Sequence, residues 1–388
     1  MKKIQSRYVI LIIASIVNFV HGNPYIWTVF QPYVREEYGL SLAASSQPFT
    51  IIIGIFAVGN MIGGFLQHKI GAKSTILAGS AVMCGGFFLA AIAPYDMPWL
   101  ISAGYGVLGG LGSGCAFSML VAVPQAWFPD KRGLVTGITI GVVGISGVLM
   151  NPLCDYVLAV HGYRTAMMMV TVIYLVLSTG AFLIEEPSKE YIDQMEPEMT
   201  KNALGNVRQY TTREMLKTRT YYIISIVMAL AIPAYVLVNP LMKSLGIERG
   251  LSNSQALMGV LIASFANIVG RFVAPWTSDR MGCKTIIRVM YVISMVSILT
   301  LTVARGGLFV FLISLVCMVY GGVVSVFPVL VAEKFGMKYQ GMNYGAIMLG
   351  YGIASVLCPY LLELVGQEMS FVIAGIACAV GLLGTGLF

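Results

Sequence analysis

Charged residues are scarce in this sequence. Only 11% of its 388 residues are charged, 57% are hydrophobic, and the mean hydropathy is +0.83. A water-soluble chain of this length needs a far more polar surface, so the composition excludes a soluble protein. The chain also lacks a phosphate-binding glycine loop, a cluster of metal ligands and a nucleophile paired with a base. These absences argue against nucleotide hydrolysis, a bound metal or other cofactor, and enzymatic catalysis.

Long hydrophobic segments recur along the whole chain. A helix needs about 20 apolar residues to cross about 30 Å of hydrocarbon, and twelve segments reach that length. The first is too long for a signal-peptide core and is not followed by a small-residue cleavage site. We therefore predict an all-α integral membrane protein with twelve transmembrane helices. The segments are about 8–30, 47–67, 75–95, 98–124, 134–155, 164–184, 221–243, 253–275, 285–304, 307–332, 342–363 and 369–388.

The net charge of +7 is explained by where the basic residues lie. With the N-terminus in the cytoplasm, 18 Lys and Arg residues fall in cytoplasmic parts of the chain and 5 in outer parts. This asymmetry follows the positive-inside rule, so the basic charge reports topology and no nucleic acid is expected as a partner. We predict a multi-pass protein in the lipid bilayer of a bacterial plasma membrane, functional as a monomer, with both termini cytoplasmic.

Two similar halves flank one long polar interruption. Residues 185–220 gather proline, glycine and acidic residues and predict a cytoplasmic linker. The flanking sequences match at an offset of 211 residues, so that Gly39-Leu40-Ser41 corresponds to Gly250-Leu251-Ser252. A parallel repeat of this kind binds its substrate near the membrane midplane between the halves. We predict one six-helix bundle over residues 1–184 and a second over residues 221–388.

Arg271 lies in an apolar stretch in which no Asp or Glu sits mid-membrane to neutralise it. An Arg at that depth costs about 3 kcal/mol on insertion scales and usually faces a cavity on a substrate path. The equivalent residue of the first half is Asn60, so the charge belongs to one half alone. We predict that Arg271 binds a carboxylate of a small organic anion through two hydrogen bonds. Alternatively, Arg271 extends toward the cytoplasmic interface near Asp279.

Two further polar residues accompany Arg271 and the first segment. Asn267 lies four residues before Arg271 on the same helical face and is expected to bind the substrate or orient Arg271, or else to join neighbouring helices. His21 shares a predicted α-helical face with Tyr25. Because His21 is the only conventional mid-membrane side chain that can carry a proton near neutral pH, we predict it as a site residue and proton-coupling candidate. The alternative is a neutral histidine bonded to a neighbouring helix.

Aromatic residues form stripes at helical spacing. Tyr344 and Tyr351 are seven residues apart and face one way, and Tyr320 and Phe327 repeat that spacing in the preceding segment. Such stripes either line a cavity or pack neighbouring helices, and we predict cavity walls. Trp27 is nearer the outer end, where it belongs either to the site or to the aromatic belt of the membrane.

Several motifs resemble those of a known family. The loops after the second and eighth segments look like the inter-helix signature of the major facilitator superfamily. They read Gly64-x-x-x-His68-Lys69-x-Gly71-x-Lys73 and Ser278-Asp279-Arg280-x-Gly282-x-Lys284. Four further motifs resemble the oxalate/formate antiporter family, which is close to the monocarboxylate transporters. These are Gly22-x-x-Tyr25-x-Trp27-Thr28, Trp127-Phe128-Pro129-Asp130-Lys131-Arg132-Gly133, Gly270-Arg271 and Asn343-Tyr344-Gly345.

The resemblance implies the major facilitator fold, in which two bundles rock around a central site. It implies that Arg271 holds a substrate carboxylate, that Tyr25 lines the site, and that Phe117 stands at an aromatic wall position. The oxalate carrier of this family has a Lys where this chain has Tyr351. One cation cannot neutralise two carboxylates in a dry cavity, so a monocarboxylate fits better than oxalate.

We therefore predict a secondary active transporter of a small monocarboxylate, working by proton symport or anion exchange. The alternatives are a dicarboxylate or formate-type antiporter and a transporter-like sensor that binds the anion and signals through a partner. A membrane enzyme would need a nucleophile or metal set that the sequence lacks. An exporter of cationic drugs would need a buried carboxylate where this chain has Arg271.

Overall fold

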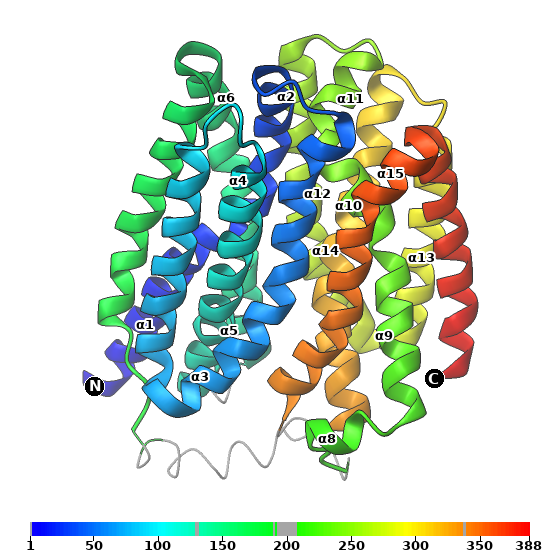
Figure 1. The fold of residues 1–388 in the computed structure, drawn as a ribbon. Coiled ribbons are helices and arrows are strands. Elements are labelled where there is room, and N and C mark those ends of the chain that lie inside the picture. The colour runs from blue at the N-terminus through cyan, green and yellow to red at the C-terminus, as the bar shows by residue number, and fades with distance from the viewer. Residues whose placement is uncertain (1, 129–131, 189–190, 192–207, 337–338) are drawn as a thin grey trace.

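The computed structural model describes residues 2–128, 132–188, 191, 208–336 and 339–388, and these contain helices and no strand (Figure 1). Ten helical stretches among them are long and apolar enough to cross a membrane. Two of the ten, Gly137–Leu183 and Met342–Leu387, have 47 and 46 residues. Each turns back at a glycine with a φ of 77°, Gly162 in the first and Gly366 in the second. The prediction of an all-helical membrane protein is confirmed.

The helical elements lie in the following order along the chain. They are α1 (Lys2–Asn18), η1 (Phe19–Ile26), α2 (Trp27–Glu37), α3 (Leu42–Ala91), α4 (Trp99–Ile101), the π-helix η2 (Ser102–Leu108), α5 (Gly109–Trp127), α6 (Arg132–Ser178), η3 (Thr179–Leu183), α8 (Thr212–Met215), α9 (Arg219–Ala231), α10 (Pro233–Val238), η4 (Asn239–Leu241), α11 (Met242–Glu248), α12 (Asn253–Met281), α13 (Cys283–Thr300), α14 (Gly306–Phe335), α15 (Gln340–Gly384) and η5 (Thr385–Leu387).

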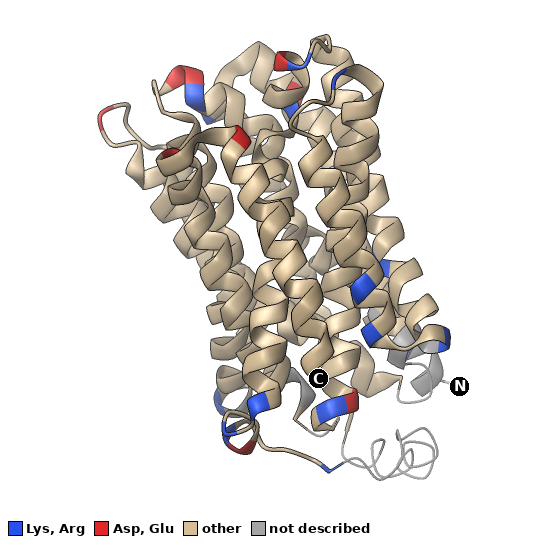
Figure 2. Cartoon of the chain, turned by 90° about the vertical axis from the view of Figure 1, so that its right-hand side faces the viewer, with Lys and Arg blue, Asp and Glu red and all other residues tan. Residues whose placement is uncertain are grey.

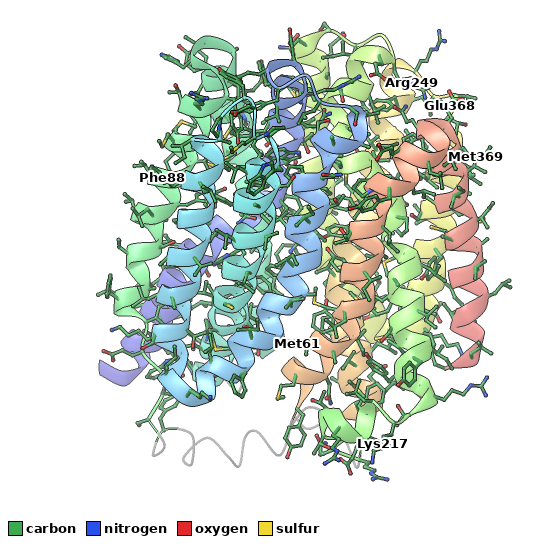
Figure 3. All side chains as sticks on the ribbon, in the orientation of Figure 1. Met61, Phe88, Lys217, Arg249, Glu368 and Met369 are labelled. Carbon is green, nitrogen blue, oxygen red and sulfur yellow. The ribbon has the colours of Figure 1, made fainter. Side chains whose placement is uncertain are left out.

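The distribution of side chains over the surface fits a membrane protein. Charged residues gather at the two ends of the helices, and the middle is almost free of them (Figure 2). Large hydrophobic side chains are exposed, among them Phe65, Phe88 and Leu149. Phe88 lies between the two ends of the helices (Figure 3). Both ends of the chain lie at the same end of the molecule as α8 (Figure 1). Of the predicted linker, residues 189–190 and 192–207 lie outside the described residues.

The first membrane span is interrupted in its middle by a 3₁₀ segment. Residues Phe19–Ile26 of η1 contain Gly22 and Pro24, and proline disrupts an α-helix because it lacks an N–H and clashes with the preceding turn. The prediction that His21 and Tyr25 share an α-helical face is therefore wrong. At three residues per turn, positions four apart point about 120° away from each other.

Close helix packing fixes α12, which carries Arg271. A Cβ atom added to Gly270 would lie 1.9 Å from the carbonyl oxygen of Met318 on α14. One at Gly321 of α14 would lie 2.1 Å from the carbonyl oxygen of Asn267. Glycines at such positions let two helix backbones approach closely. The opposite side of α12 lies against a glycine face of α6, where a Cβ at Gly144 would meet Ile268 at 2.6 Å.

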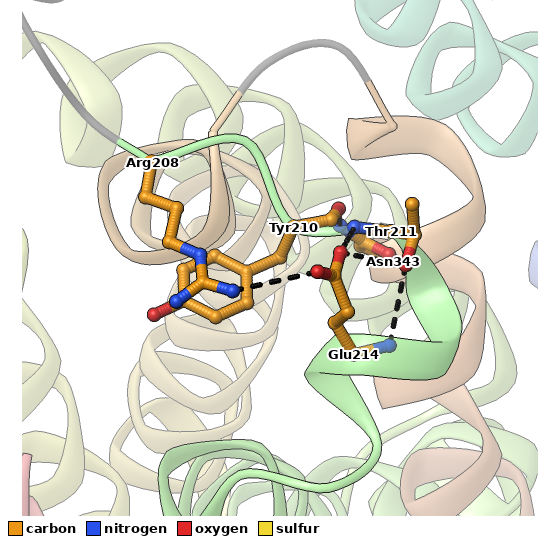
Figure 4. A network of polar contacts seen from close by, with 5 residues as sticks. All are labelled: Arg208, Tyr210, Thr211, Glu214 and Asn343. Carbon is orange, nitrogen blue, oxygen red and sulfur yellow. Dashed lines mark hydrogen bonds and ion pairs between the residues drawn. The ribbon is translucent and has the colours of Figure 1, made fainter.

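The chain that enters the second half is anchored to the start of α15. The buried Asn343 side chain, shown with its neighbours in Figure 4, donates to the carbonyl of Tyr210 at 3.0 Å. It also accepts from the Thr212 hydroxyl at 2.9 Å. Next to it, the backbone N–H of Thr211 donates to the Glu214 carboxylate and lowers the pKa of that group. The first residue of the Asn343-Tyr344-Gly345 motif thus has a structural role.

Substitution of Gly270 tests this packing. We expect Gly270→Ala to lower stability by about 1–3 kcal/mol, because the added methyl group must push α12 and α14 apart. Gly64→Ala is the matched control, since a Cβ at Gly64 meets nothing within 4 Å. Thermal unfolding of the two purified variants measures the difference, and equal midpoints would contradict the packing argument.

Candidate functional site

Arg271 is buried and makes three hydrogen bonds. Its Nε donates to Oδ1 of Asn267 at 3.0 Å, one Nη donates to the carbonyl of Ile140 at 3.3 Å, and the other donates to the hydroxyl of Tyr25. A guanidinium has five N–H donors, so one donor on each Nη atom makes no hydrogen bond within the described residues. No Asp or Glu of the described chain pairs with Arg271. The site therefore contains an unneutralised cation that keeps one free donor on each of its two Nη atoms.

Partners from both halves of the sequence hold this guanidinium. Tyr25 comes from η1 and Ile140 from α6, whereas Asn267 lies one turn away on α12. The Asn267 amide group also donates to the carbonyl of Cys317 on α14 at 3.1 Å. That bond turns Oδ1 of Asn267 toward Arg271, so the geometry fits an orienting residue.

Tyrosines gather around Arg271. The hydroxyls of Tyr320 and Tyr351 lie 2.7 Å apart, and the hydroxyl of Tyr344 donates to the carbonyl of Val324 at 3.2 Å. Tyr344 and Tyr351 lie close enough to Arg271 to interact with it electrostatically. The structure thus brings together Arg271, Asn267 and the predicted tyrosines at positions 25, 320, 344 and 351. Their role in binding stays a prediction.

Tyr235 of α10 also belongs to this cluster, although the sequence did not predict it as a site residue. Its ring stacks on that of Tyr320, with centroids 3.6 Å apart and planes 7° apart. Pro233 and Pro240 break the seventh segment into short helices, so no regular spacing marks the face that Tyr235 occupies.

Three predicted aromatic site residues lie elsewhere. Trp27 is fully buried, donates to the carbonyl of Ser45 at 2.9 Å and packs against Tyr105, and it makes no hydrogen bond or ring contact with the described residues of the cluster. Phe117 packs against Phe56 at 5.1 Å between centroids. The remaining one, Phe327, is fully buried in the hydrophobic core and makes no hydrogen bond or ring contact with the cluster.

His21 is buried in η1, and neither ring nitrogen has a hydrogen-bond partner among the described residues. The alternative of a histidine bonded to a neighbouring helix therefore finds no support, and a role in coupling stays a prediction. The part of the chain that the structure describes contains no group of three or more His, Cys, Asp and Glu suited to a metal ion.

The sequence also gave no sign of a buried ion pair. Asp155 of α6 and Lys243 of α11 pair directly, 88 residues apart, and both are nearly inaccessible to solvent. The predicted segment 134–155 ends at Asp155, but α6 continues as a helix beyond it to the turn at Gly162. Nothing local in the sequence could identify Lys243 as its partner.

Two hydrogen bonds accompany this ion pair. The hydroxyl of Thr28 donates to the carbonyl of Asn239 at 2.8 Å, and the hydroxyl of Ser244 donates to the side chain of Gln31 at 3.2 Å. With the ion pair they form a polar seam that joins α2 and α6 to η4 and α11, which we call the distal seam. It lies toward the end of the molecule opposite the two termini (Figure 1).

Comparison with known proteins agrees with these features. An uncharacterized MFS-type transporter of Escherichia coli, YhjX, is 26% identical over 362 residues, covering 91% of this chain and 86% of the relative. The oxalate:formate antiporter of Oxalobacter formigenes is 27% identical over 360 residues, covering 90% and 83%. Monocarboxylate transporter 14 of Mus musculus is 30% identical over 159 residues, covering 41% and 30%. Because the sequence profile of the Major Facilitator Superfamily matches residues 8–359, the chain belongs to that superfamily, as its motifs predicted.

Proposed function

We propose that this protein is a secondary active transporter of a small organic anion, a monocarboxylate, that binds at Arg271. The observation that carries the proposal is the buried guanidinium, which has no acidic partner in the described chain and keeps one donor on each Nη atom. With one free donor on each Nη atom, the guanidinium can bind both oxygens of a carboxylate. The carboxylate of the substrate would supply the negative charge that balances the Arg271 guanidinium.

Charge balance favours a monocarboxylate over a dicarboxylate. The resemblance to the oxalate/formate antiporter family implies a Lys at the position of Tyr351 in the oxalate carrier, and here the Tyr351 hydroxyl is paired with that of Tyr320. A second buried carboxylate would lack a cation, and an uncompensated buried charge costs several kcal/mol. A dicarboxylate or formate-type antiporter is the second candidate, because an oxalate:formate antiporter is among the relatives.

The proposed topology has twelve transmembrane helices in two bundles. Division of the two longest stretches at Gly162 and Gly366 would turn ten spans into twelve. The excess of basic residues at the end that holds both termini supports a cytoplasmic location for that end. A bacterial plasma membrane is the compartment we infer, since two relatives that cover about nine-tenths of the chain, YhjX and the oxalate:formate antiporter, come from bacteria.

Alternating access would open the site to one side of the membrane at a time, with the distal seam as the outer closure. Opening on that side must separate Asp155 from Lys243, since they belong to different halves. Removal of one partner from a buried ion pair leaves an uncompensated charge, whereas removal of both often costs little. The pair therefore controls how firmly the outer side is closed.

A double-mutant comparison tests the outer closure. We expect Lys243→Met to lower stability by about 3–5 kcal/mol and Lys243→Met with Asp155→Leu to recover most of that loss. The double variant should also open more often on the outer side, which faster thiol labelling of an added Ser244→Cys substitution would report. The seven native cysteines are buried. A double variant that is no more stable than the single one, or that is labelled no faster than the parent, contradicts this role.

Arg271→Lys tests the carboxylate site. We expect uptake into proteoliposomes to fall at least about tenfold while expression persists, because an ammonium group cannot reproduce the planar two-donor fork. The matched control is Arg249→Lys, since Arg249 lies at the end of α11 and donates to the carbonyl of Thr302 at 2.7 Å. Near-parental uptake by Arg271→Lys would exclude the proposed site. Ligand-induced thermal shifts with a panel of monocarboxylates and oxalate separate the two candidate functions.

Proton coupling is tested at His21. If transport is symport, we expect His21→Gln to lose accumulation driven by an imposed pH gradient and to keep exchange without a gradient. A cationic imidazole near the site would be favoured when an anion is bound, which couples the two binding events. Equal gradient-driven accumulation in parent and variant would exclude His21 as the proton carrier. Absence of any gradient response in the parent would favour anion exchange.

A further inference from the structure

Tyr235 differs from its neighbours in the tyrosine cluster. Its side chain is almost completely buried, and its hydroxyl has no hydrogen-bond partner among the described residues. The hydroxyl of Tyr25 accepts from Arg271, those of Tyr320 and Tyr351 bond each other, and that of Tyr344 donates to a carbonyl. A buried phenol hydroxyl normally finds a partner, because leaving it unsatisfied costs free energy.

The ring of Tyr235 is held firmly, and its surroundings place it at the candidate site. It stacks on Tyr320 from the second half and lies 6.2 Å from the ring of Phe49 from the first half, measured between centroids. Tyr235 also lies close enough to Tyr25, Tyr351 and Arg271 to interact with them electrostatically. The unpartnered donor therefore sits between the two halves, next to the proposed carboxylate site.

We propose that Tyr235 is a specificity-determining residue whose hydroxyl donates a hydrogen bond to a substrate oxygen outside the carboxylate. The proposal rests on the proposed function, in which the one remaining donor on each Arg271 Nη atom would bind the two carboxylate oxygens. The hydroxyl of Tyr235 is then free to donate to a further oxygen of the substrate. This narrows the proposed substrate class to small monocarboxylates that carry an oxygen on the carbon next to the carboxylate, that is, 2-oxo or 2-hydroxy acids.

Removal of the Tyr235 hydroxyl should change stability and ligand affinity differently from removal of a hydroxyl that only supports the structure. Removing an unsatisfied buried hydroxyl should leave the stability of the ligand-free protein unchanged or raise it. It should weaken only those ligands that used the hydroxyl. A site built to hydrogen-bond a ligand oxygen discriminates against the analogue without that oxygen, because its own polar group is then left unpaired.

The experiment compares pyruvate with propionate, which have the same number of carbon atoms and differ in the 2-oxo group. Dissociation constants are measured by calorimetry on the purified full-length protein and on Tyr235→Phe. We expect the parent to bind pyruvate about tenfold more tightly than propionate, and Tyr235→Phe to lose that preference with an unchanged propionate affinity. The melting temperature of the ligand-free variant should equal or exceed that of the parent.

Tyr163→Phe is the matched control, because Tyr163 is fully buried and its hydroxyl donates to the carbonyl of Ala90 at 3.0 Å. We expect this variant to melt lower and to keep the pyruvate preference. If the parent prefers pyruvate and Tyr235→Phe keeps that preference, or if the parent binds both acids equally, the role of Tyr235 is overturned and the proposed function stands. If the parent binds neither these acids nor lactate nor formate, the proposed function falls, and the role of Tyr235 with it.

Discussion

The central constraint on this structure is the burial of the Arg271 guanidinium without an acidic side chain of the described chain beside it. Asn267, the carbonyl of Ile140 and Tyr25 satisfy three of its donors with neutral oxygens. Neutral acceptors stabilise the charge less than a carboxylate does, and the protein therefore keeps an excess positive potential at its centre. The close approach of α12 and α14 at Gly270 holds the cation in place while two donors stay available.

The interface between the halves thus contains two buried cations with different partners. Lys243 has its counter-ion built into the protein as Asp155, whereas Arg271 has only neutral groups around it. In the proposed mechanism, the fixed counter-ion of Lys243 makes a closure that breaks each time the outer side opens. The missing counter-ion of Arg271 leaves a positive charge that the proposed anion would balance. The cost of a buried cation in a low-dielectric interior would then support closure at Lys243 and substrate binding at Arg271.

Sequence reasoning succeeded where the helix was regular and failed where it was interrupted. Arg271 and Asn267 lie on the continuous helix α12, so a spacing of four residues correctly placed them together. The prediction that His21 and Tyr25 share an α-helical face is wrong because η1 is a 3₁₀ segment. The membrane segments and the family were readable because they depend on composition and local motifs. The pairing of Asp155 with Lys243 could not be predicted, because no local sequence pattern links residues that are 88 positions apart.

The 3₁₀ segment η1 has a mechanical consequence for the site. A 3₁₀ helix rises about 2.0 Å per residue and an α-helix about 1.5 Å, so the eight residues Phe19–Ile26 are about 4 Å longer than they would be as α-helix. The two forms also differ by about 20° of rotation per residue. Conversion between them would shorten the first span and swing Tyr25 around its axis. The contact between Tyr25 and Arg271 thus depends on the winding of one short helix as much as on the distance between the two halves.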